Sequence, residues 1–100
     1  PYSGWSTYCT SKAALDMMTK TIGLEQKEII NGVKVISVYP GVVDTNMQEN
    51  IRKSNKEDFK DIQKFIDVKN NNVLTKPDDV ATKIFSISIN SNIENGSIVK

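Results

Sequence analysis

The sequence contains no histidine and only one cysteine, Cys9. Without histidine, Ser-His-Asp and Cys-His catalysis are excluded and a zinc site is not expected. A single cysteine cannot form an intramolecular disulfide, and no metal-binding spacing surrounds it, so no metal is expected. The lone thiol fits a reducing cytoplasm, which is the expected location. Any acid–base chemistry must therefore use tyrosine, lysine, aspartate or glutamate.

Long hydrophobic runs are also lacking. No stretch of about 18 apolar residues could span a membrane, and no basic segment followed by an apolar one resembles a secretory signal. The 13 basic and 12 acidic residues are well mixed and leave a net charge of +1, so neither nucleic acid nor an anionic membrane is an expected partner. With 100 residues, 38% hydrophobic and 25% charged, the chain has the composition of one small globular domain.

The first half of the chain predicts a long helix followed by a strand. Apolar residues at helical spacing indicate a helix over residues 3–30, with Ser3 or Ser6 as its N-cap. Gly32 suits the left-handed position that commonly follows a helix. The β-branched run "VKVISVY" then predicts a mostly buried strand over residues 33–39.

The second half contains three more expected elements. A charged amphipathic helix is predicted over residues 46–68, another helix over residues 76–90 with Pro77 in its first turn, and a last strand over residues 97–100. Helices between two strands favour a parallel pair in an α/β fold. Two parallel strands make a poor sheet by themselves, so the pattern indicates part of a larger sheet.

The stretch "YCTSK" places Tyr8 and Lys12 four residues apart, on one face of the predicted helix. A lysine ammonium beside a phenol lowers the pKa of that phenol toward neutrality. A tyrosine tuned in this way can give a proton to a carbonyl oxygen or take one from an alcohol. By itself the spacing is a weak signal, because an exposed tyrosine beside an exposed lysine is common on helices.

The surrounding residues make the pair specific. A helix with "GWSTYCTSKAALDMMTKTIGLEQ" followed by "GVKVISVYPGVVDTNM" resembles the short-chain dehydrogenase/reductase family, which has a Tyr-x-x-x-Lys helix and a strand ending in Pro-Gly. "PGVVDTNMQ" is similar to its sepiapterin reductase-like branch. Residues 46–81 and the closing "NGSIVK" are most similar to the bacterial benzil reductases of that branch, which use NADPH to reduce a 1,2-diketone to a hydroxyketone. The resemblance covers the whole chain and implies the C-terminal part of a Rossmann-like, doubly wound parallel sheet.

The resemblance also implies roles for individual residues. Tyr8 would be the general acid, and Lys12 would bind the nicotinamide ribose. Trp5 would line the substrate pocket, unless it is only a packing aromatic, and Met47 would join it there. Residues 46–68 would form a substrate lid. The remaining contacts to NADPH, or to NADH in its place, would come from Pro40, Gly41, Val43 and Thr45.

Some parts of the family pattern have no counterpart in these residues. The glycine-rich phosphate loop, the catalytic serine and the supporting asparagine precede the tyrosine in relatives, so residues 1–100 are expected to be a C-terminal segment of one reductase domain. Two alternatives stay open: an inactive interaction module that dimerises through the Tyr-Lys helix, and a sepiapterin-type reductase. Against the second, Lys100 stands where sepiapterin reductases are expected to carry an acid that anchors the pterin. A small carbonyl substrate and a homo-oligomer assembled through the Tyr-Lys helix are the expected partners.

Overall fold

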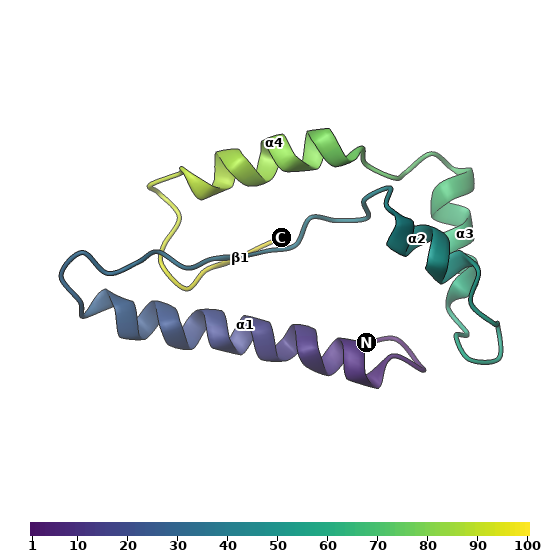
Figure 1. The fold of residues 1–100 in the computed structure, drawn as a ribbon, viewed down its shortest axis with the longest axis horizontal. Coiled ribbons are helices and arrows are strands. Elements are labelled where there is room, and N and C mark those ends of the chain that lie inside the picture. The colour runs from purple at the N-terminus through teal and green to yellow at the C-terminus, as the bar shows by residue number, and fades with distance from the viewer.

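The structure, a computed structural model, describes residues 1–100 and has an α/β architecture (Figure 1). The two strands pair in parallel, and α1 and α4 lie on opposite sides of them, whereas α2 and α3 pack together at one end (Figure 1). The expected α/β fold is confirmed. The expected order of helix, strand, helix, helix and strand differs by one element, because three helices lie between the two strands. The elements are α1 (Ser6–Lys27), β1 (Ser37–Val38), α2 (Asn46–Arg52), α3 (Ile62–Asn70), α4 (Pro77–Ser88) and β2 (Ile98–Val99).

The ends of α1 differ from the prediction. The helix spans Ser6–Lys27, its N-cap residue is Trp5, and no side chain caps it, so neither Ser3 nor Ser6 has the expected role. After the helix, Asn31 takes the left-handed conformation with φ 60°, not Gly32. Gly32 serves a different purpose, because a Cβ there would lie 2.2 Å from the carbonyl oxygen of Gln26.

The strands are shorter than predicted because a side chain takes over part of the pairing. The expected strand over residues 33–39 is reduced to Ser37–Val38, and the one over residues 97–100 to Ile98–Val99. Upstream of β1, the Val35 N–H donates to Oδ1 of Asn95 at 2.7 Å, and Nδ2 of Asn95 donates to the Val33 carbonyl at 2.9 Å. Asn95 thus satisfies backbone groups that a longer ladder would have paired.

The predicted single helix over residues 46–68 is wrong, because it is divided into α2 and α3. Between them Asn55 forms a local turn, in which its Oδ1 accepts the Glu57 N–H at 3.1 Å. This break allows Phe59 to fold inward, where it is 1% exposed and packs with Ile51 and Ile62. The helix predicted over residues 76–90 is present as α4, slightly shorter at each end.

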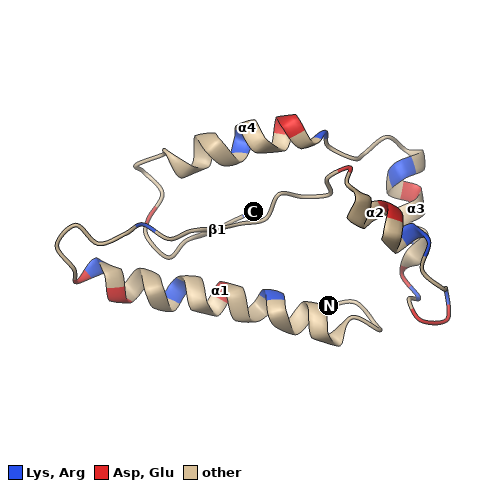
Figure 2. Ribbon diagram, viewed as in Figure 1, with Lys and Arg blue, Asp and Glu red and all other residues tan.

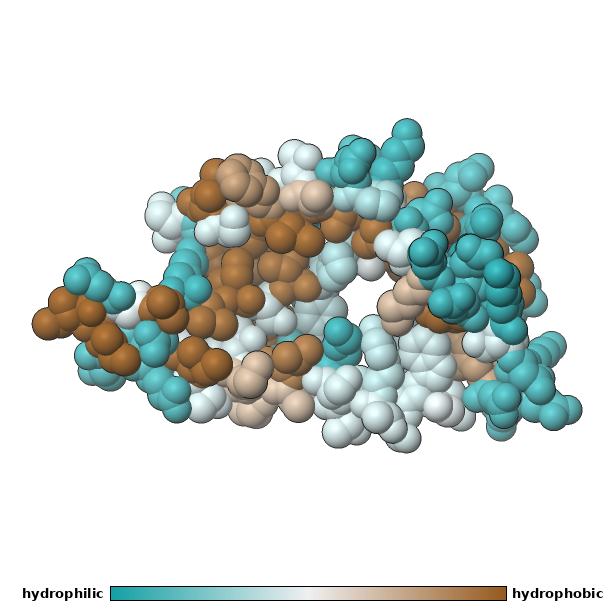
Figure 3. Space-filling view, in the orientation of Figure 1, coloured by the Kyte–Doolittle hydropathy of each residue, from teal (hydrophilic) through white to brown (hydrophobic).

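The molecule is thin and leaves much apolar surface open. It extends 51 × 29 × 16 Å, with a radius of gyration of 16.5 Å against about 13 Å for a typical domain of this length. Only seven residues are buried, and hydrophobic side chains gather around the strands and the facing sides of α1 and α4 (Figure 3). Charges of both signs are spread along the helices and around α2 and α3 (Figure 2). No helix combines the length and hydrophobicity that crossing a membrane requires.

One close contact fixes α1 against the turn that precedes β2. Gly23 of α1 is buried, and a Cβ added to it would come within 2.4 Å of the Cα of Gly96. Gly96 itself has φ 78°, a conformation that side chains rarely adopt. Two glycines therefore let the helix and the turn approach backbone to backbone, which sets the distance between α1 and the strands.

Candidate active site

Tyr8 and Lys12 lie on the same face of α1. The Lys12 Nζ is 5.6 Å from the centroid of the Tyr8 ring, within the range of a cation–π contact. Neither the Tyr8 hydroxyl nor the Lys12 ammonium takes part in a hydrogen bond or an ion pair within the chain. Tyr8 is 39% exposed and Lys12 is exposed as well, so both polar groups are available to a ligand.

The segment that follows β1 lies opposite this helix face. A cavity of about 760 Å³ is bounded by α1 on one side and by the end of β1 and the start of α2 on the other. Helix and loop meet here because β1 packs against α1, and the loop begins at Pro40-Gly41, where the strand ends. All eight site residues expected from the sequence line this cavity: Trp5, Tyr8, Lys12, Pro40, Gly41, Val43, Thr45 and Met47.

The backbone of Val43 offers a free donor and a free acceptor to this cavity. Val43 forms an isolated parallel bridge with Thr75, in which the Asp44 N–H donates to the Thr75 carbonyl and the Thr75 N–H donates to the Val42 carbonyl, both at 3.0 Å. In a parallel bridge of this kind the bridging residue's own N–H and C=O point away from the partner. Those of Val43 make no hydrogen bond within the chain.

Thr45 and Gly41 lie on the same side of the cavity as Val43, and together with Pro40 these residues form what we call the cofactor wall. Thr45 is the N-cap residue of α2, yet its hydroxyl makes no capping hydrogen bond. Gly41 has φ 78°, and a Cβ built there would meet nothing within 4 Å, so its backbone borders open space. The wall therefore combines an unpaired hydroxyl, unpaired peptide groups and a bare stretch of backbone.

These groups fit the nicotinamide riboside end of a dinucleotide. A carboxamide carries donors and an acceptor that complement the N–H and C=O of Val43. Ribose hydroxyls suit the Lys12 ammonium, and a flat ring can lie on the bare wall at Gly41. The Thr45 hydroxyl can donate to or accept from the same ligand.

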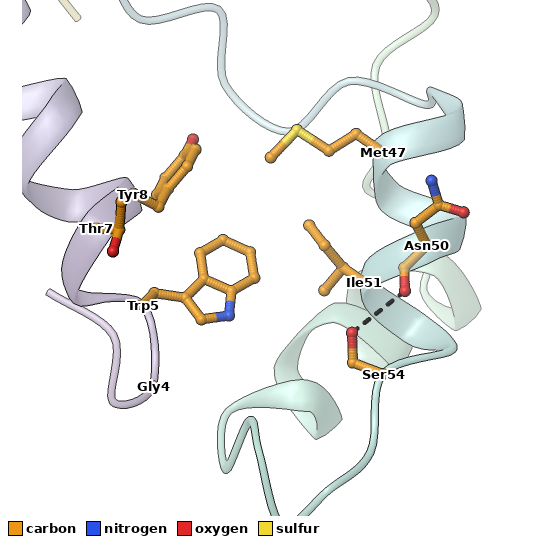
Figure 4. A pocket seen from close by; sticks show the side chains of 8 residues that line it. All are labelled: Gly4, Trp5, Thr7, Tyr8, Met47, Asn50, Ile51 and Ser54. Atoms are coloured by element: carbon orange, nitrogen blue, oxygen red, sulfur yellow. Dashed lines mark hydrogen bonds between the residues drawn. The ribbon is translucent and has the colours of Figure 1, made fainter.

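A second cavity, of about 610 Å³, opens between the start of α1 and α2 (Figure 4). In Figure 4 Tyr8 comes from α1 and Trp5 from the position directly before that helix, and both point toward Met47 and Ile51 of α2. Below them the Ser54 hydroxyl donates to the Asn50 carbonyl at 3.3 Å. Because Trp5, Tyr8, Met47 and Ile51 also line the first cavity, the Tyr8 ring stands where the two cavities meet.

Trp5 is both a packing residue and a lining residue. Its indole stacks on Phe59 with 4.6 Å between centroids and an interplanar angle of 25°. On its other side it meets Tyr8 edge to face, at 5.1 Å and 73°. The indole therefore packs in the core and also lines both cavities, and the buried Phe59 holds it beside Tyr8.

Sequence reasoning did not single out Asp16, which also lines the larger cavity. The Tyr39 hydroxyl donates to its Oδ2 at 2.5 Å, and the Ser37 hydroxyl donates to its Oδ1 at 3.2 Å. The hydrogen bond to Asp16, followed by desolvation, raises the pKa of Tyr39 above its ordinary value. The sequence signal that could have drawn attention to Asp16 is its spacing, because it follows Lys12 by four residues and so lies on the same helix face.

Gln48 was also missed. It is 9% exposed, it lines the larger cavity, and its Oε1 has no hydrogen-bond partner. It lies one helical turn after Thr45, which is the sequence signal that could have drawn attention to it. The Nη1 of Arg52, four residues further along, is likewise buried without a partner, so the two side chains can satisfy each other by a change of rotamer.

The chain is similar to several proteins that are already characterised. The family model described as short chain dehydrogenase matches residues 1–56. The benzil reductase ((S)-benzoin forming) of Bacillus subtilis (strain 168) is 46% identical over 98 residues, which are 98% of this chain and 40% of that protein. The sepiapterin reductase of Rattus norvegicus is 41% identical over 54 residues, covering 54% of this chain and 19% of that protein.

The chain is also similar to a protein of known structure. The "Crystal structure of KRED1-Pglu enzyme" superposes with a TM-score of 0.85 and 31% identity, over 99% of this chain and 41% of that one. The chain thus spans about two-fifths of the length of that protein and of the bacterial benzil reductase. Because the family model covers more than half of these residues, and because the expected helix and loop motifs meet at one cavity, the chain belongs to the short-chain dehydrogenase family.

Proposed function

We propose that the protein is an NADPH-dependent carbonyl reductase, which reduces a 1,2-diketone such as benzil to the hydroxyketone and can accept NADH in place of NADPH. One observation carries the proposal: the larger cavity is lined by four sets of polar groups that have no partner within the chain. They are the Tyr8 hydroxyl, the Lys12 ammonium, the Val43 peptide groups and the Thr45 hydroxyl. The 46% identity to a bacterial benzil reductase supports the choice of substrate.

In this reaction the chain supplies the proton and the binding groups. When bound, a reduced nicotinamide supplies the hydride that the carbonyl carbon accepts. The Tyr8 hydroxyl donates its proton to the carbonyl oxygen, which becomes the alcohol. The phenolate that remains is stabilised by the Lys12 ammonium and takes a new proton from solvent. Lys12 also holds the ribose hydroxyls, while Val43 and Thr45 orient the carboxamide beside the Pro40-Gly41 wall.

The smaller cavity is the proposed substrate site. Its apolar lining comes from the indole of Trp5 and the side chains of Met47 and Ile51, which suit an aryl group next to the reacting carbonyl. Tyr8 stands at the border with the larger cavity, so a carbonyl bound there lies between the proton donor and the cofactor wall. We propose that α2 and α3 act together as the lid over this site.

Replacing Tyr8 tests the proposal. In protein expressed from its complete coding sequence, Tyr8→Phe should lower kcat for benzil reduction by about 10²- to 10⁴-fold, because it removes only the proton-donating hydroxyl. Tyr2→Phe is the matched control, since Tyr2 packs on Trp5 through its ring and its hydroxyl makes no hydrogen bond within the chain. Equal activity of the wild type and Tyr8→Phe would refute the proposed role, and no activity in the wild type would favour an interaction module.

Sepiapterin is a second candidate substrate, because the chain is also similar to a sepiapterin reductase. Lys100 follows the last strand, and its Nζ lies over the ring of Tyr39, 5.5 Å from the centroid, so no acid occupies this position. Comparing kcat/KM for benzil and sepiapterin separates the two. A higher value for sepiapterin would replace the diketone in the proposal.

Self-association belongs to the same proposal. Several large apolar side chains of α1 are exposed, among them Met17 at 63% and Leu24 at 70%. We propose that copies of the protein associate as a homodimer through this helix, because exposed apolar side chains are stabilised by burial against another molecule. Light scattering of the wild type and of Leu24→Glu tests this, and a wild-type monomer would contradict it. The single cysteine suits the cytoplasm, which is the location we propose.

A further inference from the structure

The carboxylate of Asp16 links α1 to the end of β1 through two hydrogen bonds. Each of its oxygens accepts a different donor: Oδ2 accepts the Tyr39 hydroxyl at 2.5 Å, and Oδ1 accepts the Ser37 hydroxyl at 3.2 Å. The two donors lie on the same side of the strand, because side chains two residues apart in a strand face the same way. The carboxylate therefore holds this short strand at two successive points.

The two ends of this link lead directly to the proposed cofactor wall. Tyr39 is followed at once by Pro40 and Gly41, and Lys12 lies one helical turn before Asp16. Asp16, Tyr39 and Lys12 all line the larger cavity. The contact between Asp16 and Tyr39 therefore joins the helix face that carries Lys12 to the residue directly before the Pro40-Gly41 backbone.

Most other contacts at this strand join it to β2 and not to α1. β1 pairs with β2 at two positions, Ser37 with Ile98 and Val38 with Val99. At its two ends the Tyr39 N–H donates to the Val99 carbonyl and the Gly96 N–H donates to the Val35 carbonyl, both at 2.8 Å. The backbone contact of α1 at Gly23 is with Gly96, in the turn before β2. Beyond Tyr39 the next backbone pairing is the isolated bridge at Val43. The ring of Tyr39 is held on its face by the Lys100 ammonium, which contacts the strand side and not α1.

We propose that Asp16 is a positioning residue for the reductase reaction, which holds Ser37 and Tyr39 so that the Pro40-Gly41 wall faces Lys12 at the distance that the nicotinamide riboside requires. This inference rests on the proposed function. Without the link, the wall samples positions in which it and Lys12 cannot contact the same ligand. Only the fraction of molecules with the correct distance then binds, and the apparent Kd rises in inverse proportion to that fraction.

The experiment measures the Kd for NADPH and kcat at saturating NADPH in protein expressed from its complete coding sequence. The variants are Asp16→Ala, Asp16→Asn and Tyr39→Phe. We expect Asp16→Ala to raise the Kd about tenfold, with kcat at saturation lowered less than threefold. Asp16→Asn should have a smaller effect, because its amide keeps one acceptor oxygen. Tyr39→Phe keeps the ring and removes only the hydroxyl, so it tests the link even if Asp16→Ala does not fold.

Two controls separate positioning from general stability. Thr21→Val removes another hydrogen bond of α1, which the exposed Thr21 hydroxyl donates to the Met17 carbonyl at 3.0 Å, and should leave the Kd unchanged. Tyr39→Phe should add nothing to the effect of Asp16→Ala, since both remove the same contact. Unchanged Kd in Asp16→Ala and Tyr39→Phe, or fully additive effects, would overturn the inference. A wild type that binds neither NADPH nor NADH would instead refute the proposed function on which it rests.

Discussion

The indole of Trp5 meets the ring of Tyr8 edge to face, with 5.1 Å between their centroids. This contact places an aromatic wall directly beside the proposed proton donor. Trp5→Leu should therefore lower kcat/KM for benzil about tenfold, because an aryl substrate loses an aromatic partner and a shaped wall. The value for 2,3-butanedione, which has no ring, should change much less. Parallel kinetics with both diketones provide the measurement, and equal losses would show that Trp5 acts only through the fold.

Phe59 holds the aromatic cluster behind this wall. It is 1% exposed and packs against Ile51, Ile62 and the indole of Trp5. Phe59→Ala should lower the free energy of unfolding by about 3–5 kcal/mol, as measured by urea denaturation. Phe85→Ala is the matched control because Phe85 is 65% exposed, and its effect should stay within about 0.5 kcal/mol. Similar losses for the two variants would contradict the assigned core.

Because of the backbone contact between Gly23 and Gly96, we expect Gly23→Ala to lower the stability of the protein, although helix propensity alone would raise it. Alanine is favoured over glycine inside a helix by about 1 kcal/mol. Gly23→Ala should nevertheless destabilise the protein by at least about 1 kcal/mol, because its Cβ would lie 2.4 Å from the Cα of Gly96. The exposed Thr21→Ala on the same helix should be neutral or stabilising. Thermal unfolding of both variants tests this, and a stabilised Gly23→Ala would show that α1 and the turn are further apart.

The hydrogen bond between Tyr39 and Asp16 has a consequence at high pH. Because it raises the pKa of Tyr39 above the ordinary value of 10.0, the neutral phenol is favoured in the folded state. Its contribution to stability is complete below about pH 10 and is lost as the pH rises through the higher pKa of the folded state. In an ultraviolet titration, a tyrosine ionisation above the ordinary pKa of 10.0 should be present in the wild type, and Tyr39→Phe should remove it. Persistence of that step in Tyr39→Phe would contradict the assignment.

Part of the cavity lining could be predicted from the sequence, from the spacing of Tyr8 and Lys12 and, for the other expected residues, from the family resemblance. Tyr8 and Lys12 share a helix face because of their spacing, and Pro40-Gly41 ends a strand that runs parallel to β2. A parallel pair with a helix beside it brings the strand's carboxyl end next to that helix, so motifs far apart in sequence meet. The chemical roles of these residues stay predictions.

The parts that could not be predicted depend on contacts between distant residues. Residues 46–68 look like one amphipathic helix, and only the burial of Phe59 against the neighbouring helix favours the break near Asn55. The shortened strand depends on Asn95, whose side chain pairs with backbone about sixty residues earlier. Asp16 looks like an ordinary exposed charge of a helix until Tyr39 is placed beside it. Local patterns carry no information about such pairs.

A titration of NADPH, followed by nicotinamide fluorescence, tests the central claim most directly. In protein expressed from its complete coding sequence, we expect saturable binding at one site per chain. Lys12→Met should weaken it at least tenfold, because the ammonium that holds the ribose is lost, whereas Lys20→Met on the same helix should bind like the wild type. Absence of saturable binding, or equal affinities for Lys12→Met and the wild type, would contradict the assignment of this cavity to the nicotinamide.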